Sequence, residues 1–543
     1  FKYIQTRDIR STFYLLFAIF FGILLCAPQL FPTIELYTQS FRSTIFQKAE
    51  VVPWAYLPTL FAPDFFGNPV TRNAWLGSYA EWNGYIGLAG LCLCLYALKN
   101  IKKGVILFFF LGVLVGLLFA YDSPLLSLLT SFKIPVLSTS ALSRVIVLFS
   151  FSAAILAGFG LDVLIEDIKH RKFRGIVVLL CFTGFIMVGL WAASILKIFL
   201  SPEHALIARS NLKFPTLIFI ALYVVFGIGV FVKSKKTPMM VAILLVLLVT
   251  LDLFRFSTKW MPFDPKNLVY PDAPITRFYT KISGVSRVFG NFGGEDAVYY
   301  HLPSVEGYDA IYVRRYGQFL ASLDRGTLKD SYRSVVSYPK MGKYALSGAN
   351  FLGVKYIVHK ITDGQNVWEF PFWKYDLKTI KLIFDDHKYQ VLENTNAFPR
   401  AFLVNTVVER TDPQEILDTM FNPGFNLRNS AVVEENINLG SYLGTGSAEI
   451  TKYLPNTVQI RTHSDKESFL VLTDAFYPGW TAQVDGKPAP IYRTDFAFRG
   501  VAVPKGAHRI DFDYAPASFR YGIYVAIIGL VGMAVLAIAK TKK

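Results

Sequence analysis

The hydrophobic positions of this 543-residue chain gather in eight long apolar runs, seven of which precede a large polar block. A helix needs about 20 apolar residues to cross a bilayer, and each run comes near that length. The runs cover residues 13–31, 84–98, 105–121, 142–165, 176–200, 214–232, 238–256 and 521–539. The pattern therefore predicts a membrane α-helical bundle of about eight spans.

The polar block between residues 257 and 520 reads differently in its two parts. Its first part mixes short strand patterns with helical ones, which indicates α/β structure. Its last part, residues 468–516, alternates apolar and polar positions between turn signals at Asp485-Gly486 and Lys505-Gly506, which indicates a β-meander. The expected domains are a transmembrane region at 1–256 with an outer loop at 32–83, an α/β region at 257–431, a β-sandwich at 432–520, and a last span with a basic tail at 521–543.

The charges of the connecting segments alternate along the chain. Sixteen lysines and arginines lie in one set of segments, which includes both ends of the chain, against three acidic residues. The positive-inside rule places this set in the cytoplasm and the polar block outside the plasma membrane, with the C-terminus inside. The net charge of +16 is then explained by topology, so no nucleic-acid partner is expected.

Composition supports a membrane protein. Hydrophobic residues make up 53% of the chain and charged residues only 17%, which is too apolar for an ordinary soluble protein. The four cysteines all fall in apolar runs, so the outer domain is expected to lack disulfides. Because the chain begins at Phe1 without a methionine, we expect further spans upstream.

Several segments together resemble one known family. They are QLFPTIELYTQSFR, the FFGNP loop, SVEGYDAIYVRRYGQFL, LGVKYIV, VLENTNAFPRAFLV and LTDAFYPGWTAQVDGKPAPIYRTDFAFRGVAVPKGAHRIDFDY before the last run. The chain resembles the YfhO family of bacterial multi-pass membrane proteins, which is assigned to the GT-C glycosyltransferase superfamily. The resemblance implies a hexosyltransferase that moves a sugar from a polyprenyl-phosphate donor to a cell-surface glycopolymer such as a teichoic acid. It also implies a catalytic acidic residue in a first outer loop upstream of Phe1.

Glycosyl transfer from a lipid phosphate needs a carboxylate base and positive charge for the leaving phosphate. Within this chain we expect Asp64 and Glu35 as catalytic carboxylates, with Asp64 a candidate ligand for a divalent cation (Mg or Mn). Arg144 and Arg42 are the candidate partners of the donor phosphate. The alternatives are a turn-forming aspartate beside proline, a carboxylate at a span end, and an arginine that snorkels from its span.

A second set of candidates lies in the polar block and concerns the acceptor or its sugar. The residues are Glu306, Asp309, Arg314, Arg315 and Trp480. Carboxylates, guanidinium groups and aromatic rings together suit carbohydrate. A surface ion-pair network explains the charged residues equally well, and a sandwich core explains the tryptophan.

Two other classes of function are compatible with this organisation. A transporter or flippase for lipid-linked sugars would require charged or helix-breaking residues in mid-span, and these runs are nearly free of central charge. A non-catalytic membrane anchor that binds cell-wall polymer would make the loop carboxylates dispensable. The expected partners in every case are membrane lipid, a lipid-linked sugar or a surface polymer.

Overall fold

The chain forms two compact units. The computed structural model describes residues 9–43, 51–134, 141–261, 263–282, 284–290, 294–309, 311–331, 335–361, 378–435, 437 and 444–541. The helical unit comprises Phe1–Tyr14 and Ile45–Asp264, and the β-rich unit comprises Leu15–Thr44 and Pro265–Lys543. The β-rich unit is thus built from both ends of the sequence, and the helical unit is mostly inserted between them.

The helical unit contains six apolar helices, each of which coincides with one predicted run. They are α5 (Leu88–Ala97), α6 (Gly104–Ala120), α8 (Ile146–Lys169), α9 (Arg174–Ile195), α10 (Pro202–Phe231) and α11 (Thr237–Trp260). At the start of α10 the Ser201 hydroxyl accepts a hydrogen bond from the amide of His204 at 3.1 Å, and Pro202 occupies the first turn. These are standard signals for a helix start.

Length separates these helices into two groups. Four of them, counting the turn that leads into α8, are long and apolar enough to cross a membrane, as is α17 (Ala517–Thr541). A sixth candidate is the pair α2 (Ile9–Leu25) and α3 (Ala27–Gln39), which is bent by 69°. The described part of α5 and α6 is shorter, so five candidate spans are shown and the count of eight stays a prediction.

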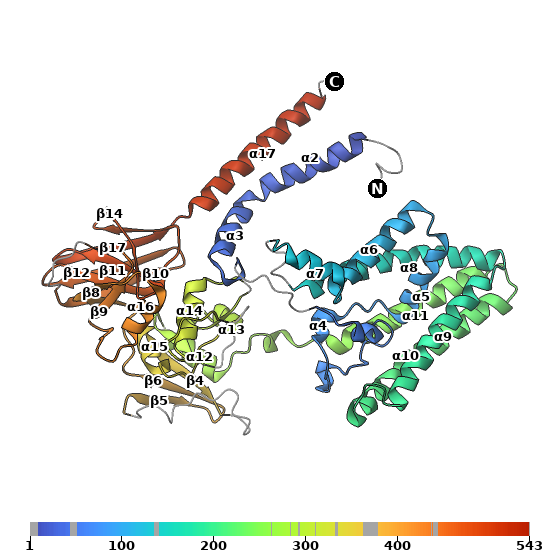
Figure 1. The fold of residues 1–543 in the computed structure, drawn as a ribbon, viewed down its shortest axis with the longest axis horizontal. Helices are drawn as coiled ribbons and strands as arrows, with labels where there is room; N and C mark the ends of the chain where they lie inside the picture. The colour runs from blue at the N-terminus through green and yellow to red at the C-terminus, as the bar shows by residue number, and fades with distance from the viewer. Residues whose placement is uncertain are drawn as a thin grey trace. The chain divides into compact units, whose positions relative to one another are not determined.

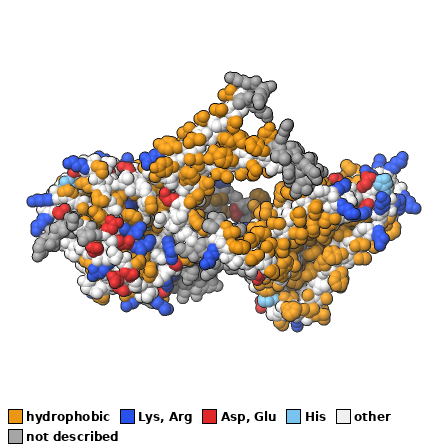
Figure 2. Space-filling view, turned by 45° about the horizontal axis from the view of Figure 1, so that its top comes forward, with side chains coloured by type: hydrophobic (Ala, Val, Ile, Leu, Met, Phe, Trp, Pro, Cys, Tyr) orange, Lys and Arg blue, Asp and Glu red, His pale blue; other side chains and the backbone are white. Residues whose placement is uncertain are grey.

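Small residues let the helices of this unit approach closely. A Cβ on Gly160 of α8 would lie 1.8 Å from the carbonyl oxygen of Leu93 in α5, and one on Gly116 of α6 would lie 2.5 Å from the amide of Phe149 in α8. Such backbone contacts are typical of helix packing in membranes. Figure 2 shows hydrophobic side chains over much of the helical surface, whereas charged side chains are spread over the β-rich unit.

Two sheets of the β-rich unit form a sandwich, labelled in Figure 1. The five-stranded sheet has the order β10 (Gly446–Leu454), β11 (Thr457–Ser464), β17 (Gly506–Tyr514), β13 (Trp480–Val484), β14 (Lys487–Ala489). The six-stranded sheet has the order β7 (Ala401–Val404), β12 (Ser468–Ala475), β16 (Phe498–Val503), β15 (Tyr492–Thr494), β9 (Ser430–Val433), β8 (Thr406–Glu409). Strands from both sides of residue 432 therefore share one sheet.

The six-stranded sheet is buried on both faces. Leu470 and Leu472 of β12 face the other sheet, while Phe469 and Val471 face a core that includes α14 (Arg314–Ser322), α15 (Ala345–Phe351) and α16 (Pro413–Met420). A strand covered on both sides reads as a continuous apolar run. This explains why SFLVL at the start of β12 departs from the alternation expected for residues 468–516.

A smaller mixed sheet completes the unit. Its order is β1 (Arg287–Phe289), β4 (Val354–Lys360), β6 (Tyr389–Asn394), β5 (Ile380–Asp385), packed against α12 (Pro274–Ile282) and α13 (Gly294–Tyr299). A two-stranded sheet, β2 (Gly307–Tyr308) with β3 (Val335–Val336), lies apart from it. Helices and strands both occur in this region, as the sequence pattern predicts.

The predicted turns occur where expected. Asp485 and Gly486 have φ values of 50° and 79° and join β13 to β14, as a tight hairpin between twisted strands requires. Gly506, with φ 115°, opens β17. These turns fix where β14 and β17 begin.

The first and last apolar segments meet within the β-rich unit. Helix α17 packs along α3, and Figure 1 shows the two side by side. A Cβ on Gly522 would lie 2.6 Å from the carbonyl oxygen of Ala27, so glycine is needed at this crossing. The contact fixes α3, and with it Glu35, against the sandwich.

Candidate functional site

Asp64 lies in the loop before α5 and is buried. The loop begins with a 3-10 helix, η2 (Trp54–Leu60), which is interrupted by Pro58 and is too short to cross a bilayer. Tyr56 and Phe66 stack at a centroid distance of 5.2 Å and join the core of the helical unit. This aromatic packing holds the following turn, and hence Asp64, in place.

Three side chains donate hydrogen bonds to the Asp64 carboxylate. Asn68 Nδ2 and the Tyr79 hydroxyl contact Oδ1 at 2.8 and 2.6 Å, and Lys259 Nζ contacts Oδ2 at 2.7 Å. Burial alone would raise the pKa of Asp64, but the bonds from Lys259, Tyr79 and Asn68 outweigh it and hold that pKa below its usual value. Asp64 is therefore an anion paired with an ammonium group.

Two long helices contribute to this site. Lys259 comes from the last turn of α11, and Asn211 of α10 donates to the Asp64 carbonyl oxygen at 2.7 Å. In the same loop Trp75 stacks on His204 of α10 with a centroid distance of 4.4 Å. The loop thus closes over one end of the helical unit, where the first turns of α10 and the last of α11 lie.

Sequence analysis missed Lys259. It follows the apolar run of α11 by one turn, and it lies at the same expected end of the spans as Asp64. A lysine at a span end is common, so this signal did not distinguish it from an anchor. The pair with Asp64 depends on tertiary structure.

Arg144 lies next to the same loop but is already paired. Its Nη2 atom contacts Glu81 Oε1 at 2.5 Å, and the guanidinium is largely exposed. Glu81 and Tyr79 both belong to the short helix α4 (Tyr79–Trp82), so α4 carries one partner of Arg144 and one of Asp64. Arg144 and Asp64 are therefore linked through α4, because each contacts a different residue of this single helical turn.

Glu35 and Arg42 belong to the other unit. The Glu35 carboxylate accepts a hydrogen bond from the Tyr477 hydroxyl, and burial together with Glu35 raises the pKa of Tyr477. Burial raises the pKa of Tyr312 to about 12, and Arg42, in η1 (Phe41–Ser43), is one of the charges near enough to oppose this rise. The two predicted carboxylates, Asp64 and Glu35, therefore lie in different compact units.

A cleft of about 990 Å³ opens in the β-rich unit between the small mixed sheet and the sandwich. Two of the predicted acceptor residues, Glu306 and Trp480, line it. Burial raises the pKa of Glu306 to about 7, while one carboxylate oxygen accepts the amide of Tyr338 at 2.8 Å. Trp480 is half-buried beside Tyr514, with ring centroids 5.3 Å apart.

The other three predicted acceptor residues make local contacts. Arg314 forms a two-pronged pair with Asp330 at 2.9 and 3.0 Å, and Asp309 accepts the amide of Ile311 at 2.9 Å in a turn. Arg315 contacts Glu434 and donates to the carbonyl oxygen of Phe496 at 3.1 Å. None of these three is among the residues that line the described part of the cleft.

The cleft floor contains charged residues that sequence analysis missed. Arg287, Arg400 and Arg499 surround the single carboxylate of Asp474, and all four are buried. Each arginine stands within or next to an apolar strand, as in VSRVF, FPRAFLV and FAFRGVAV. A charge inside a strand buried on both faces is rare, and this signal could have identified them.

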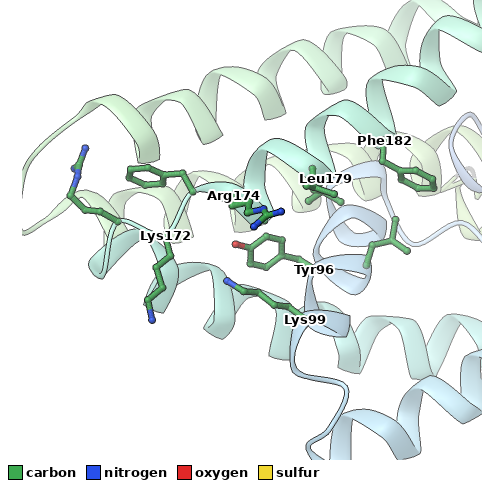
Figure 3. A pocket seen from close by; sticks show the side chains of 11 residues that line it. Tyr96, Lys99, Lys172, Arg174, Leu179 and Phe182 are labelled. Carbon is green, nitrogen blue, oxygen red and sulfur yellow. The ribbon is translucent and has the colours of Figure 1, made fainter.

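A second pocket, of about 800 Å³, lies in the helical unit beside the first turns of α9. Lys99 and Arg174 lie on either side of Tyr96, and Leu179 and Phe182 extend an apolar wall (Figure 3). Lys99 is paired with Asp167. No carboxylate is among the described residues that line this pocket, so it lacks the base that glycosyl transfer requires.

The residues around Asp64 do not form a divalent-cation site. Lys259 already contacts Oδ2, and a cation there would be repelled by the ammonium. Among the described residues no group of three His, Cys, Asp or Glu side chains is arranged to hold a metal ion. Lys259 is thus the cation that the structure places against Asp64.

Comparison with known proteins assigns the chain to a family. The family model described as "Bacterial membrane protein YfhO" matches residues 1–419 and 441–526. A protein from Bacillus subtilis (strain 168), named "Uncharacterized protein YfhO", is 28% identical over 122 residues, which is 22% of this chain and 14% of that protein. No solved structure matches the chain. The chain belongs to the YfhO family of bacterial membrane proteins.

Proposed function

We propose that this chain acts in a membrane glycosyltransferase. The enzyme transfers a sugar from a polyprenyl-phosphate donor to a surface glycopolymer such as a teichoic acid. The chain crosses the bacterial plasma membrane several times, with the polar block of residues 257–520 outside and the C-terminus in the cytoplasm. Membership of the family and the five candidate spans support the membrane assignment, and the activity rests on the chemistry of the Asp64 site.

The pairing of Asp64 with Lys259 carries this proposal. Transfer from a lipid phosphate needs a carboxylate for the acceptor hydroxyl and a cation for the leaving phosphate. Here the two groups stand 2.7 Å apart at one end of an apolar helical unit, under a loop rich in aromatic residues. An amphiphilic donor with its tail along the helices would present its phosphate at this level.

In the proposed reaction Lys259 turns from Asp64 to the donor phosphate. This movement leaves Oδ2 of Asp64 free to accept the proton of the acceptor hydroxyl. The hydroxyl oxygen forms a bond to C1 of the sugar as the bond from C1 to the phosphate oxygen breaks, and the polyprenyl phosphate leaves with the electron pair. Tyr79 and Asn68 keep the carboxylate oriented through Oδ1.

The β-rich unit supplies a place for the acceptor. Its cleft is large enough for several sugar residues and combines aromatic rings with charged groups, as carbohydrate sites do. Glu35 and Arg42, which belong to this unit, would then act on the acceptor side. A transporter or a non-catalytic anchor would not need Asp64 to accept a proton. Measurement of sugar transfer separates these alternatives.

The test is sugar transfer by the full-length protein in lipid vesicles. Radiolabelled polyprenyl-phosphate sugars are supplied as donors and a surface polymer as acceptor, for the wild type and Asp64→Asn. We expect Asp64→Asn to lower the initial rate at least roughly 100-fold. The matched control, Glu166→Gln, changes an exposed carboxylate of α8 that pairs with His170, and it should leave the rate unchanged.

Each outcome decides between the candidate functions. Equal transfer by Asp64→Asn and the wild type would remove Asp64 from the reaction. Movement of donor across the vesicle membrane without transfer would establish a flippase. Polymer binding with neither transfer nor movement would establish an anchor.

A further inference from the structure

Three arginines in the floor of the cleft carry more positive charge than the carboxylate beside them can balance. Arg287 begins β1, Arg400 precedes β7 and Arg499 lies in β16, while among the described residues the one carboxylate that pairs with all three is that of Asp474 in β12. All four residues line the cleft and are at most 7% exposed. Three guanidinium groups against one carboxylate leave two positive charges in a poorly solvated place, which is unfavourable without an anion.

Arg287 has a full set of structural bonds. It donates to the Leu352 carbonyl at 2.6 Å, to Thr473 Oγ1 at 2.8 Å and to Asp474 Oδ1 at 2.9 Å. These bonds join the small mixed sheet to the sandwich. We therefore assign Arg287 a structural role.

Arg499 is bonded much more weakly. Its Nη2 atom is 3.3 Å from Asp474 Oδ2, its Nε donates to the Asp474 carbonyl at 3.5 Å, and its Nη1 has no partner among the described residues. The Nε of Arg400 is likewise buried without a described partner. Burial lowers the pKa of Arg499, which Asp474 only partly opposes. Two buried donors on separate arginines of the cleft thus have no partner among the described residues, and an anion in the cleft could supply one.

Aromatic side chains frame these donors. The Arg499 guanidinium lies 4.0 Å from the centre of the Trp480 ring, and that of Arg400 lies 4.2 Å from the Tyr453 ring. Tyr477, held by Glu35, and Tyr514 line the same cleft. Rings beside a cationic floor suit a sugar or polyol that carries an acidic group.

We propose that this cleft binds a phosphate group of the acceptor polymer, with Arg499 and Arg400 on the phosphate oxygens and Trp480 against the adjoining polyol or sugar. Phosphate is favoured over carboxylate because its several oxygens can accept from two guanidinium groups at once. The inference rests on the proposed function, since it names the acceptor as a phosphate-linked polymer. Arg499 and Arg400 would be acceptor-binding residues.

Binding is measured on the full-length protein in nanodiscs, without sugar donor. The probes are poly(glycerol phosphate), the carboxylate polymer polygalacturonate, neutral dextran and inorganic phosphate. We expect poly(glycerol phosphate) to bind most tightly, with an affinity that falls as salt is raised. Equal binding of dextran would overturn the proposal, and inorganic phosphate as tight as the polymer would limit the site to free phosphate.

Two variants test the residues. Arg499→Lys keeps the positive charge but loses the planar guanidinium with its paired N–H donors. It should weaken polymer binding roughly tenfold. Asn456→Asp adds one negative charge at the exposed rim of the cleft without a change of shape, and it should weaken binding several-fold even if Arg499→Lys fails to fold. The matched control is Asn422→Asp, an exposed asparagine after α16 that is not among the residues lining the cleft.

The outcomes separate this inference from the proposed function. If sugar transfer proceeds but folded Arg499→Lys and Asn456→Asp bind the polymer like the wild type, the cluster is structural and the inference is wrong. If the polymer binds through Arg499 and no donor yields transfer, the inference stands without the enzymatic function. Displacement of the polymer by polyprenyl phosphate alone would assign the cleft to the donor and overturn the acceptor assignment.

Discussion

The ammonium nitrogen of Lys259 lies 2.7 Å from Oδ2 of Asp64, although 195 positions separate the two residues. This pair joins the last turn of α11 to the loop before α5, and the carboxylate is buried. Removal of either partner leaves a poorly solvated charge behind. The pair is thus both the chemical centre of the proposed reaction and a structural link.

We expect the two residues to be energetically coupled. Asp64→Asn and Lys259→Met should each lower the free energy of unfolding by about 1–3 kcal/mol, and the double variant should lose clearly less than their sum. The measurement is thermal or denaturant unfolding in detergent. Additive losses would show that the two groups do not interact in the folded protein.

The second prediction concerns Asp495, which is fully buried between β15 and β16. Oδ1 accepts the amide of Val432 at 2.8 Å, and Oδ2 has no described partner. Burial raises its pKa from 3.8 to about 8. The folded state therefore binds a proton that the unfolded state releases between these values, and stability falls as pH rises from about 4 to 8.

Asp495→Asn should remove this fall in stability with rising pH. The residue has a φ of 47°, a backbone region that asparagine tolerates well. We expect the variant to be more stable than the wild type by on the order of 2–4 kcal/mol at pH 8 and about equal to it at pH 4. The melting temperatures of the wild type and the variant between pH 4 and pH 8 test this prediction. A difference in melting temperature that is the same at both pH values would contradict the raised pKa of Asp495.

The third prediction concerns Glu306 in the cleft, whose pKa burial raises to about 7. Below that pH the carboxyl is neutral, and above it the negative charge opposes an anionic ligand. Binding of poly(glycerol phosphate) should therefore weaken several-fold between pH 6 and pH 8, and Glu306→Gln should flatten this dependence. His301→Gln is the control for the histidine that lines the same cleft, and it should preserve the dependence.

The fourth prediction concerns the contact between α17 and α3. A methyl group at Gly522 would overlap the backbone of Ala27 and Pro28, at 2.6 and 2.7 Å. Gly522→Ala should cost about 1–3 kcal/mol of stability. Gly227→Ala in α10, where nothing lies within 4 Å, should be neutral or slightly stabilising. Equal effects of the two substitutions would show that the helices do not pack closely.

The sequence predicted the kinds of element well because hydrophobic periodicity is a local property. Each apolar run contains at least one helix, and the predicted turn at Asp485-Gly486 joins β13 to β14. Helix length was harder to predict. The first run bends by 69° where Pro28 opens α3, and α5 starts only after Gly87, which has a φ of 82°.

The sites depend on distant parts of the chain, and here the sequence was less informative. It named Asp64, Glu306 and Trp480 as candidates, but neither Lys259 nor the cluster of Arg287, Arg400 and Arg499. These residues meet only through helix packing and strand order. Their local signals, a lysine at a span end and arginines in apolar strands, gained meaning once their partners were known.

The contact of α3 with α17 has a consequence for synthesis of the protein. A chain is made from its N-terminus, and domains generally fold as they emerge. The helical unit is complete before most of the β-rich unit has been translated, whereas α3 must wait for the final helix before its packing partner exists. Arrest or truncation shortly before α17 would therefore leave a finished helical unit and a sandwich with all its strands but an uncovered α3, and quality-control proteases would encounter that intermediate first.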